Sequence, residues 1–126
     1  MLKAAREVRE RAHAPYSGYR VGAAVLGAGG GIHAGCNVEN SAYPEGLCAE
    51  AAAIAAMVAA GEGRIQAVLV VGDGADLITP CGGCRQKIRE FAGPDTPVHL
   101  CTPAAVVQTV TLDELLPLSF GPEHLE

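Results

Sequence analysis

The sequence predicts an α/β fold of three layers (α/β/α), in which a mixed five-stranded sheet lies between helices. Segments with helical and with strand character follow one another in the order α-β-β-α-β-α-β-β-α. Residues 65–71 are apolar except for Gln66, as expected for a strand that is covered on both faces. The length of 126 residues suits a single domain, 1–126, that buries about two-thirds of its unfolded surface.

The first half of the chain is expected to form two helices and a hairpin. Residues 2–14 carry apolar side chains at helical spacing among charged ones, which indicates an amphipathic helix that Pro15 ends. Residues 21–26 and 32–37 are expected to be two strands joined by the glycine-rich turn 27–31. Residues 48–60 form an alanine-rich helix that Gly61 ends.

The second half adds three strands and two helices. After the strand 65–71, a loop leads to Pro80, which stands where a helix over residues 81–91 begins. Two short strands follow at 98–101 and 105–110. Residues 111–116 are expected to form a short capped helix that Pro117 closes.

Two motifs, Cys48-Ala49-Glu50 and Pro80-Cys81-Gly82-Gly83-Cys84, together offer three thiolates and one carboxylate. Residues three apart share one face of a helical turn, so both cysteines of the second motif can reach one ion. Cys48 is the natural third ligand, because Cys48 and Cys81 each stand at a predicted helix start, where the helix dipole favours thiolates. Three protein ligands leave one tetrahedral position of zinc for water.

Glu50 need not be a ligand, and its carboxylate can move a proton to and from that water. The set matches the general signature of zinc-dependent nucleobase deaminases in its three-cysteine form. Two other interpretations remain: Cys36 as a fourth ligand of a closed structural site, or Cys81 and Cys84 as a redox pair. Neither explains the neighbouring Glu50.

Polar residues suited to a ribose follow the second expected strand. Asn37, Glu39 and Asn40 offer the donors and acceptors that vicinal hydroxyls need, although such a stretch is also typical of a solvated turn. Tyr16 and Tyr19 cluster with a serine beside the first strand. They are expected either to pack the first helix on the sheet or to line a pocket.

The composition limits the classes of substrate and the cellular compartment that the chain suits. The net charge is −5 and no block of Lys or Arg occurs, which argues against a polymeric nucleic acid and for a small-molecule substrate. No apolar run is long enough to span a membrane. Five cysteines, three of them assigned to the metal, and the lack of a signal peptide predict a reducing cytoplasm.

With these motifs assembled, the chain closely resembles the small, homotetrameric cytidine deaminases over nearly its whole length. The matching stretches are Ala14-Pro15-Tyr16-Ser17, Val21-Gly22-Ala23-Ala24, Gly35-Cys36-Asn37-Val38-Glu39-Asn40, Cys48-Ala49-Glu50, Pro80-Cys81-Gly82-Gly83-Cys84-Arg85-Gln86 and Leu115-Leu116-Pro117. The resemblance implies zinc-dependent hydrolytic deamination of cytidine and deoxycytidine to uridine and deoxyuridine, with release of ammonia, in pyrimidine salvage.

The resemblance also implies roles for individual residues. Zinc is bound by Cys48, Cys81 and Cys84, and Glu50 is the proton shuttle. Asn37 and Glu39 bind the ribose hydroxyls, and the backbone at Ala49 helps to hold the base. Tyr19 stands where the family usually has a Phe near the base, and Phe120 stands where a C-terminal Phe reaches a neighbouring subunit's pocket. A homotetramer with shared active sites is therefore expected.

Two alternative functions remain, and one position differs from the family pattern. A blasticidin S-type aminonucleoside deaminase would share the metal motif but is not expected to keep Asn-Val-Glu-Asn. A zinc-stabilised module without catalysis could dispense with Glu50, which is present here. Ala51 stands where many family members have Arg beside the thiolates, so the two helix N-termini are expected to offset the thiolate charge.

Overall fold

Five strands form one mixed sheet in the computed structural model, which describes all residues from 1 to 126. Their order across the sheet is β2-β1-β3-β4-β5. Only β3 and β4 run parallel, and every other neighbouring pair is antiparallel. The bounds are β1 Gly22–Gly27, β2 Ile32–Cys36, β3 Ile65–Val71, β4 Pro97–Cys101 and β5 Val106–Thr111. The predicted mixed five-stranded sheet is confirmed.

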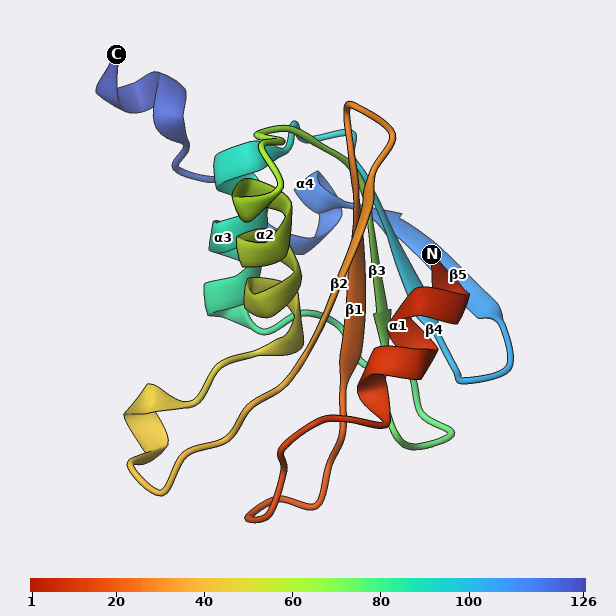
Figure 1. Ribbon diagram of the computed structural model, residues 1–126. Helices are drawn as coiled ribbons and strands as arrows, with labels where there is room; N and C mark the ends of the chain where they lie inside the picture. The colour runs from red at the N-terminus through yellow and green to blue at the C-terminus, as the bar shows by residue number, and fades with distance from the viewer.

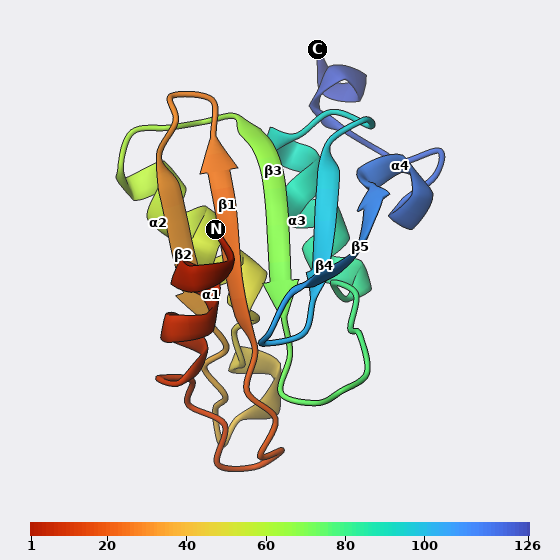
Figure 2. The ribbon, with the colours of Figure 1, turned by 90° about the vertical axis from the view of Figure 1, so that its right-hand side faces the viewer.

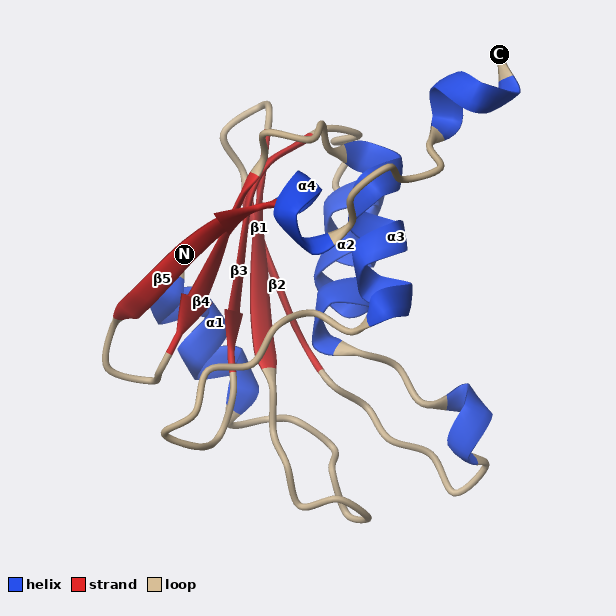
Figure 3. Ribbon diagram, turned by 180° about the vertical axis from the view of Figure 1, so that it is seen from behind, coloured by secondary structure: helices blue, strands red, loops and turns tan.

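Helices cover both faces of this sheet, as predicted. Helix α1 lies on one face and the pair α2 and α3 lies on the other, so the fold has three layers (Figures 1 and 2). Figure 3 shows the same layers from behind, with the short α4 beside the β5 end of the sheet. The bounds are α1 Leu2–Arg9, α2 Ala49–Ala59, α3 Gly82–Phe91 and α4 Leu112–Leu115, with 3₁₀ helices η1 Tyr43–Glu45 and η2 Pro122–Leu125. None of the helices combines the length and apolar character needed to cross a bilayer.

Two apolar layers hold the helices on the sheet. The larger cluster has 14 buried residues and joins α2 and α3 to the sheet through side chains such as Val25, Met57 and Ile88. A smaller cluster of five residues lies under α1 and includes Ala5 and Leu69. Strand β3 contributes to both clusters, which agrees with its apolar sequence.

The first helix is shorter than the sequence predicts. It ends at Arg9, and the amides of residues 10–12 donate to carbonyl groups three residues back, which tightens the chain into turns. His13 then pairs with the segment 37–39: its amide donates to Asn37 O, and its carbonyl accepts from Glu39 N. The predicted helix over 2–14 is therefore wrong beyond Arg9, because these long-range bonds draw residues 12–14 into extended structure.

One end of the sheet gathers the segments that carry the cysteine motifs and the polar residues 37–40. The N-termini of α2 and α3 point toward this end, where the chain segments 10–21 and 37–48 also protrude (Figures 1 and 3). The C-terminal segment 117–126 leaves the body at the opposite end (Figure 1). Helix α2 lies directly against β2, since a Cβ at Gly35 would stand 2.6 Å from the Cβ of Ala52. This close packing sets the position of the helix start.

Candidate active site

The starts of α2 and α3 bring three thiols together. Cys48 is the N-cap of α2 and Cys81 is the N-cap of α3, while Cys84 lies in the first turn of α3. The three Sγ atoms all lie within 4.8 Å of one another, and the Cys48 and Cys81 sulfurs are 3.8 Å apart. The prediction that the two cysteine motifs meet in the folded chain is thus confirmed.

This spacing fits a tetrahedral metal. Two sulfurs about 2.3 Å from one zinc ion at the tetrahedral angle are about 3.8 Å apart. Cys36 lies on β2 outside the group of three, so the thiols present suit an ion with one further position open. All five cysteines are free thiols, including Cys81 and Cys84. The donor set therefore fits zinc in its catalytic arrangement better than a closed four-cysteine site.

The thiols differ in their acidity. Burial raises the pKa of Cys84, and the nearby Glu50 charge raises it further. Burial also raises the pKa of Cys48. Only the pKa of Cys81 is lowered, chiefly by a hydrogen bond from the backbone amide of Cys84. Burial thus opposes ionisation of Cys48 and Cys84, and zinc binding would release protons from these thiols.

Glu50 lies in the first turn of α2, and only 5% of its surface is exposed. Burial raises the pKa of its carboxyl group, while a hydrogen bond from Cys84 and the charge of Lys87 oppose that rise. A raised pKa brings a carboxyl group closer to the range in which it can both accept and donate a proton. Its environment therefore suits the proton shuttle that the sequence predicts.

A cavity of about 390 Å³ joins this metal group to the expected ribose-binding residues. Glu50, Cys48 and Cys81 line it together with Asn37 and Glu39. The remaining lining residues are Val21, Tyr43, Gly46, Leu47, Ala49, Ile78 and Thr79. The predicted catalytic residue Glu50, two of the thiols and three of the predicted substrate-binding residues, Asn37, Glu39 and Ala49, thus share one cavity.

Glu39 is held in place by Tyr16 and Ser17, through contacts that the sequence did not predict. Its carboxylate accepts hydrogen bonds from the amides of Tyr16 and Ser17, at 3.0 and 3.1 Å, and from the Ser17 hydroxyl. These bonds, that of the hydroxyl first, lower the pKa of Glu39. The only sequence signal was that Ser17 lies in a matching motif, because its contact with Glu39 joins segments 22 residues apart.

Asn37 is oriented by two further bonds. Its Oδ1 accepts from the amide of Val21 at 2.8 Å, and its Nδ2 donates to the carbonyl of Tyr19 at 2.9 Å. Both polar ends of the carboxamide are therefore bonded to peptide groups on either side of Arg20. Each end keeps the capacity for one more hydrogen bond.

Arg85 is a second residue whose role the sequence did not reveal. Its guanidinium donates to the carbonyl of Pro80 at 2.7 Å and to the hydroxyl of Thr79 at 2.9 Å. A third bond, 2.8 Å long, reaches the carbonyl of Leu115. Arg85 therefore fixes the chain that leads into Cys81, one of the three clustered thiols, and ties it to α4.

Tyr19 and Phe120 lie outside the residues that line the cavity. The Tyr19 hydroxyl approaches Gly72 so closely that a Cβ there would stand 2.5 Å from it. Phe120 is 55% exposed, and its ring stacks on His124 at 5.2 Å between centroids. Its carbonyl accepts a 2.9 Å bond from Gln86, so the tail is attached to the outside of α3.

Comparisons with known proteins agree with this geometry. A family model described as the cytidine and deoxycytidylate deaminase zinc-binding region matches residues 1–100, which include all three metal-site cysteines and Glu50. The chain is 40% identical over 125 residues to a cytidine deaminase of Sporosarcina psychrophila, covering 99% of this chain and 92% of that protein.

Solved structures are similar over the same extent. The crystal structure of cytidine deaminase from Burkholderia pseudomallei is 40% identical and gives a TM-score of 0.87, covering 94% of this chain and 95% of the other. The structure of cytidine deaminase from Mycobacterium tuberculosis is 36% identical with a TM-score of 0.85, covering 96% of this chain and 94% of the other. The three-layer fold is thus shared with these proteins.

Proposed function

The chain belongs to the cytidine deaminase family with its zinc-binding region, and on that premise we propose that it hydrolyses cytidine and deoxycytidine to uridine and deoxyuridine with release of ammonia. The observation that carries the proposal is the shared cavity. Its metal end, at Cys48 and Cys81, suits the reacting base, and its other end, at Asn37 and Glu39, suits a ribose. A nucleoside needs both ends at once.

Three thiolates at the helix starts would hold the zinc ion. Zinc, when bound there, supplies a water molecule whose pKa is lowered enough to act as a nucleophile near neutral pH. The buried Glu50 carboxylate accepts a proton from the water that adds to C4 of cytosine, and it delivers this proton to N3. Glu50 then takes the remaining proton from the hydroxyl group on C4 and passes it to the amino group, so that the C4–N bond breaks, ammonia leaves and the C4 carbonyl of the uracil ring forms. One carboxyl group thus serves as base and acid, which its raised pKa permits.

The remaining residues bind and orient the substrate. Ala49 is buried at the first position of α2, where its amide has no partner within the helix, so it can donate to the base. Glu39 is kept ionised by its bonds to residues 16 and 17 and can accept from ribose hydroxyls. Asn37 has one donor and one acceptor site left for the same hydroxyls.

The finer assignments complete the proposal. The protein is a single catalytic domain that works as a homotetramer with shared active sites, in cytoplasmic pyrimidine salvage. Phe120 supports this assembly, because an exposed aromatic ring on a protruding tail suits a neighbouring subunit's cavity. Tyr19 packs against the loop after β3 and supports the wall behind the base. Five free thiols agree with a reducing compartment.

The test is product release. Zinc-loaded protein is incubated with cytidine, beside a Glu50→Gln variant of equal zinc content, and uridine and ammonia are measured. We expect equal release of both products by the wild type and a loss of rate of at least about a hundredfold in the variant. If the wild type released nothing from cytidine or deoxycytidine, the proposal would fail. Turnover of a blasticidin S-type nucleoside would then identify an antibiotic deaminase, and binding without turnover an inactive module.

A further inference from the structure

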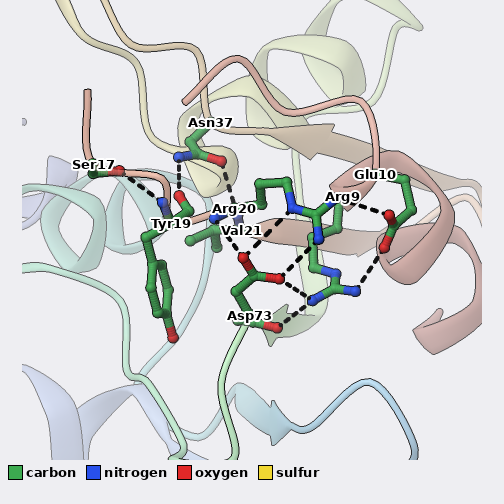
Figure 4. Close-up of polar contacts among 9 residues, drawn as sticks. Arg9, Glu10, Ser17, Tyr19, Arg20, Val21, Asn37 and Asp73 are labelled. Atoms are coloured by element: carbon green, nitrogen blue, oxygen red, sulfur yellow. Dashed lines mark hydrogen bonds and ion pairs between the residues drawn. The ribbon is translucent and has the colours of Figure 1, made fainter. Parts of the chain in front are cut away.

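Four charged side chains form a cluster beside the ribose-binding end of the cavity, outside its lining. Asp73, in the loop after β3, accepts from Arg9 Nη1 at 2.8 Å and from Arg20 Nη2 at 3.2 Å. The amide of Arg20 also lies 3.5 Å from the carboxylate. Glu10 accepts from both arginines, at 2.6 and 2.9 Å, and so closes the ring of contacts (Figure 4). The cluster joins α1, the β3 loop and the segment before β1.

Asp73 connects the partly exposed Arg20 to the buried Arg9. Arg9 is buried, with 9% of its side chain exposed, and it also donates to the carbonyl of Gly72 at 3.0 Å. Its Nε has no partner, so the buried guanidinium depends on the bonds that it does make. Arg20 is 38% exposed and is held mainly by Asp73. The hydrogen bond between the two side chains lowers the pKa of Asp73 and raises the pKa of Arg20.

The held residue Arg20 lies between the two residues that orient Asn37. The carbonyl before it, of Tyr19, and the amide after it, of Val21, bond to the two ends of the Asn37 carboxamide (Figure 4). Moving Arg20 would therefore move both partners together. A rotation of the carboxamide would exchange its free donor and acceptor sites, which a ribose hydroxyl distinguishes.

We propose that Asp73 is a positioning residue that fixes residues 19–21 through Arg20 and thereby holds the Asn37 carboxamide in the orientation that binds the ribose. This role rests on the proposed function, because it takes the ribose as the ligand of Asn37. Asp73 itself does not line the cavity, so it acts on the substrate only through Asn37.

The kinetic test compares Asp73→Asn with Asp76→Asn. Asp76 lies in the same loop, is exposed and makes no side-chain hydrogen bond, so its variant carries the same charge change without the contacts. We expect Asp73→Asn to raise KM for cytidine about tenfold with kcat and zinc content nearly unchanged. The affinity for 2′,3′-dideoxycytidine, which lacks both ribose hydroxyls, should stay the same. A fall in kcat, an equal loss of affinity for both nucleosides, or the same effect in Asp76→Asn would overturn the proposal.

Two further measurements separate positioning from general damage and from failure of the reaction itself. In an Asn37→Ala background, Asp73→Asn should add no further rise in KM, and additive effects would contradict the proposal. Hydrogen exchange at the amide of Val21, which needs no substrate, should be about tenfold faster in Asp73→Asn and unchanged in Asp76→Asn. Unchanged exchange in Asp73→Asn would refute the positioning role. If the wild type deaminated nothing but Val21 responded as expected, only the proposed function would fail.

A second variant covers the case in which Asp73→Asn does not fold. Arg20→Gln alters a half-exposed side chain and removes its guanidinium from the same carboxylate. It should raise KM for cytidine several-fold in the same ribose-dependent way. A wild-type KM in folded Arg20→Gln would overturn the proposal.

Discussion

The two ends of the cavity are built in different ways. At the metal end, Cys84 and Glu50 are buried side chains in the first turns of helices that a 14-residue apolar cluster holds on the sheet. At the proposed ribose end, Asn37 and Glu39 lie on extended chain and are oriented by hydrogen bonds with the segment 16–21. The proposed catalytic groups are therefore held by tertiary packing, and the proposed ribose-binding groups are held by hydrogen bonds between two loops.

This difference predicts that changes at the two ends will affect different kinetic constants. A helix start packed on a core changes position only if the core changes, so substitutions there should alter kcat. Loop-to-loop hydrogen bonds open locally at low cost, so substitutions there should alter KM. The following variants test that separation, in order of decreasing effect.

Cys84→Ser should have the largest effect. Replacing the buried Cys84 thiolate should lower zinc affinity by more than about a hundredfold and should abolish turnover. Even the loss of a residue that only hydrogen-bonds to a metal ligand lowers metal affinity by about 10- to 100-fold. Zinc content by metal analysis and uridine release are the measurements. Cys36→Ser is the control and should keep its zinc, since Cys36 lies outside the group of three. Zinc loss in that control would instead indicate a four-cysteine site.

Gly35→Ala tests whether the metal end depends on packing. The added Cβ would meet the Cβ of Ala52 at 2.6 Å and push α2 away from β2. We expect the free energy of unfolding to fall by about 1–3 kcal/mol and kcat to fall more than KM rises. Gly63→Ala, where a Cβ meets nothing within 4 Å, is the matched control for chemical denaturation and kinetics. A change confined to KM would break the proposed separation of the two ends.

Ser17→Ala tests the ribose end through its pH dependence. The Ser17 hydroxyl is the first cause of the lowered pKa of Glu39, so Glu39 stays ionised to unusually low pH in the wild type. Without that bond the pKa should return toward 4.5, and KM for cytidine should begin to rise at a higher pH as the solution is acidified. Ser41→Ala, at an exposed serine in the neighbouring loop, should leave the KM profile unchanged. Identical KM profiles for wild type and Ser17→Ala would contradict this role.

Glu62→Gln should have the smallest effect, and only on stability. Glu62 bonds to His33 at 2.5 Å and to the amide of Gly29 at 2.6 Å, beside the turn that joins β1 and β2. These bonds, that of His33 first, lower the pKa of Glu62 below 4.5, so they stabilise the fold above that pH and lose this effect as the pH falls through the lowered pKa.

The variant should therefore unfold more easily than the wild type at neutral pH, with the difference shrinking in acid. Denaturant unfolding at neutral pH and at a pH below the lowered pKa of Glu62 measures this difference. Glu45→Gln, at an exposed glutamate, is the control for the loss of one negative charge. Both kcat and KM should stay at wild-type values, because the turn between β1 and β2 lies at the end of the sheet away from the site (Figure 1). Altered kinetics in Glu62→Gln would show that this turn is coupled to the cavity.

The sequence predictions were accurate where structure depends on interactions between residues close in sequence, and they failed where it depends on contacts between distant residues. The strand 65–71 matches β3 at both ends, and the predicted helix starts at Cys48 and Cys81 match their N-cap positions, because apolar periodicity and capping act within a few residues. The helix over 2–14 failed beyond Arg9, where His13 bonds to a segment 24 residues away in the chain. Local pattern carries no signal for such a bond.

By itself, the sequence determined the order of elements, the three thiols with one carboxylate, and the polar pair Asn37 and Glu39, because each is visible as residue type and spacing. Only the tertiary structure decided how those groups are held. Two of the features that it decided are contacts between segments distant in sequence: the bond from Ser17 to Glu39, and the bonds of Asp73 with Arg9 and Arg20. The third is the burial of Glu50, which raises the pKa of its carboxyl group. Burial and long-range hydrogen bonds depend on which surfaces meet, and that is settled only when the sheet and its helices pack together.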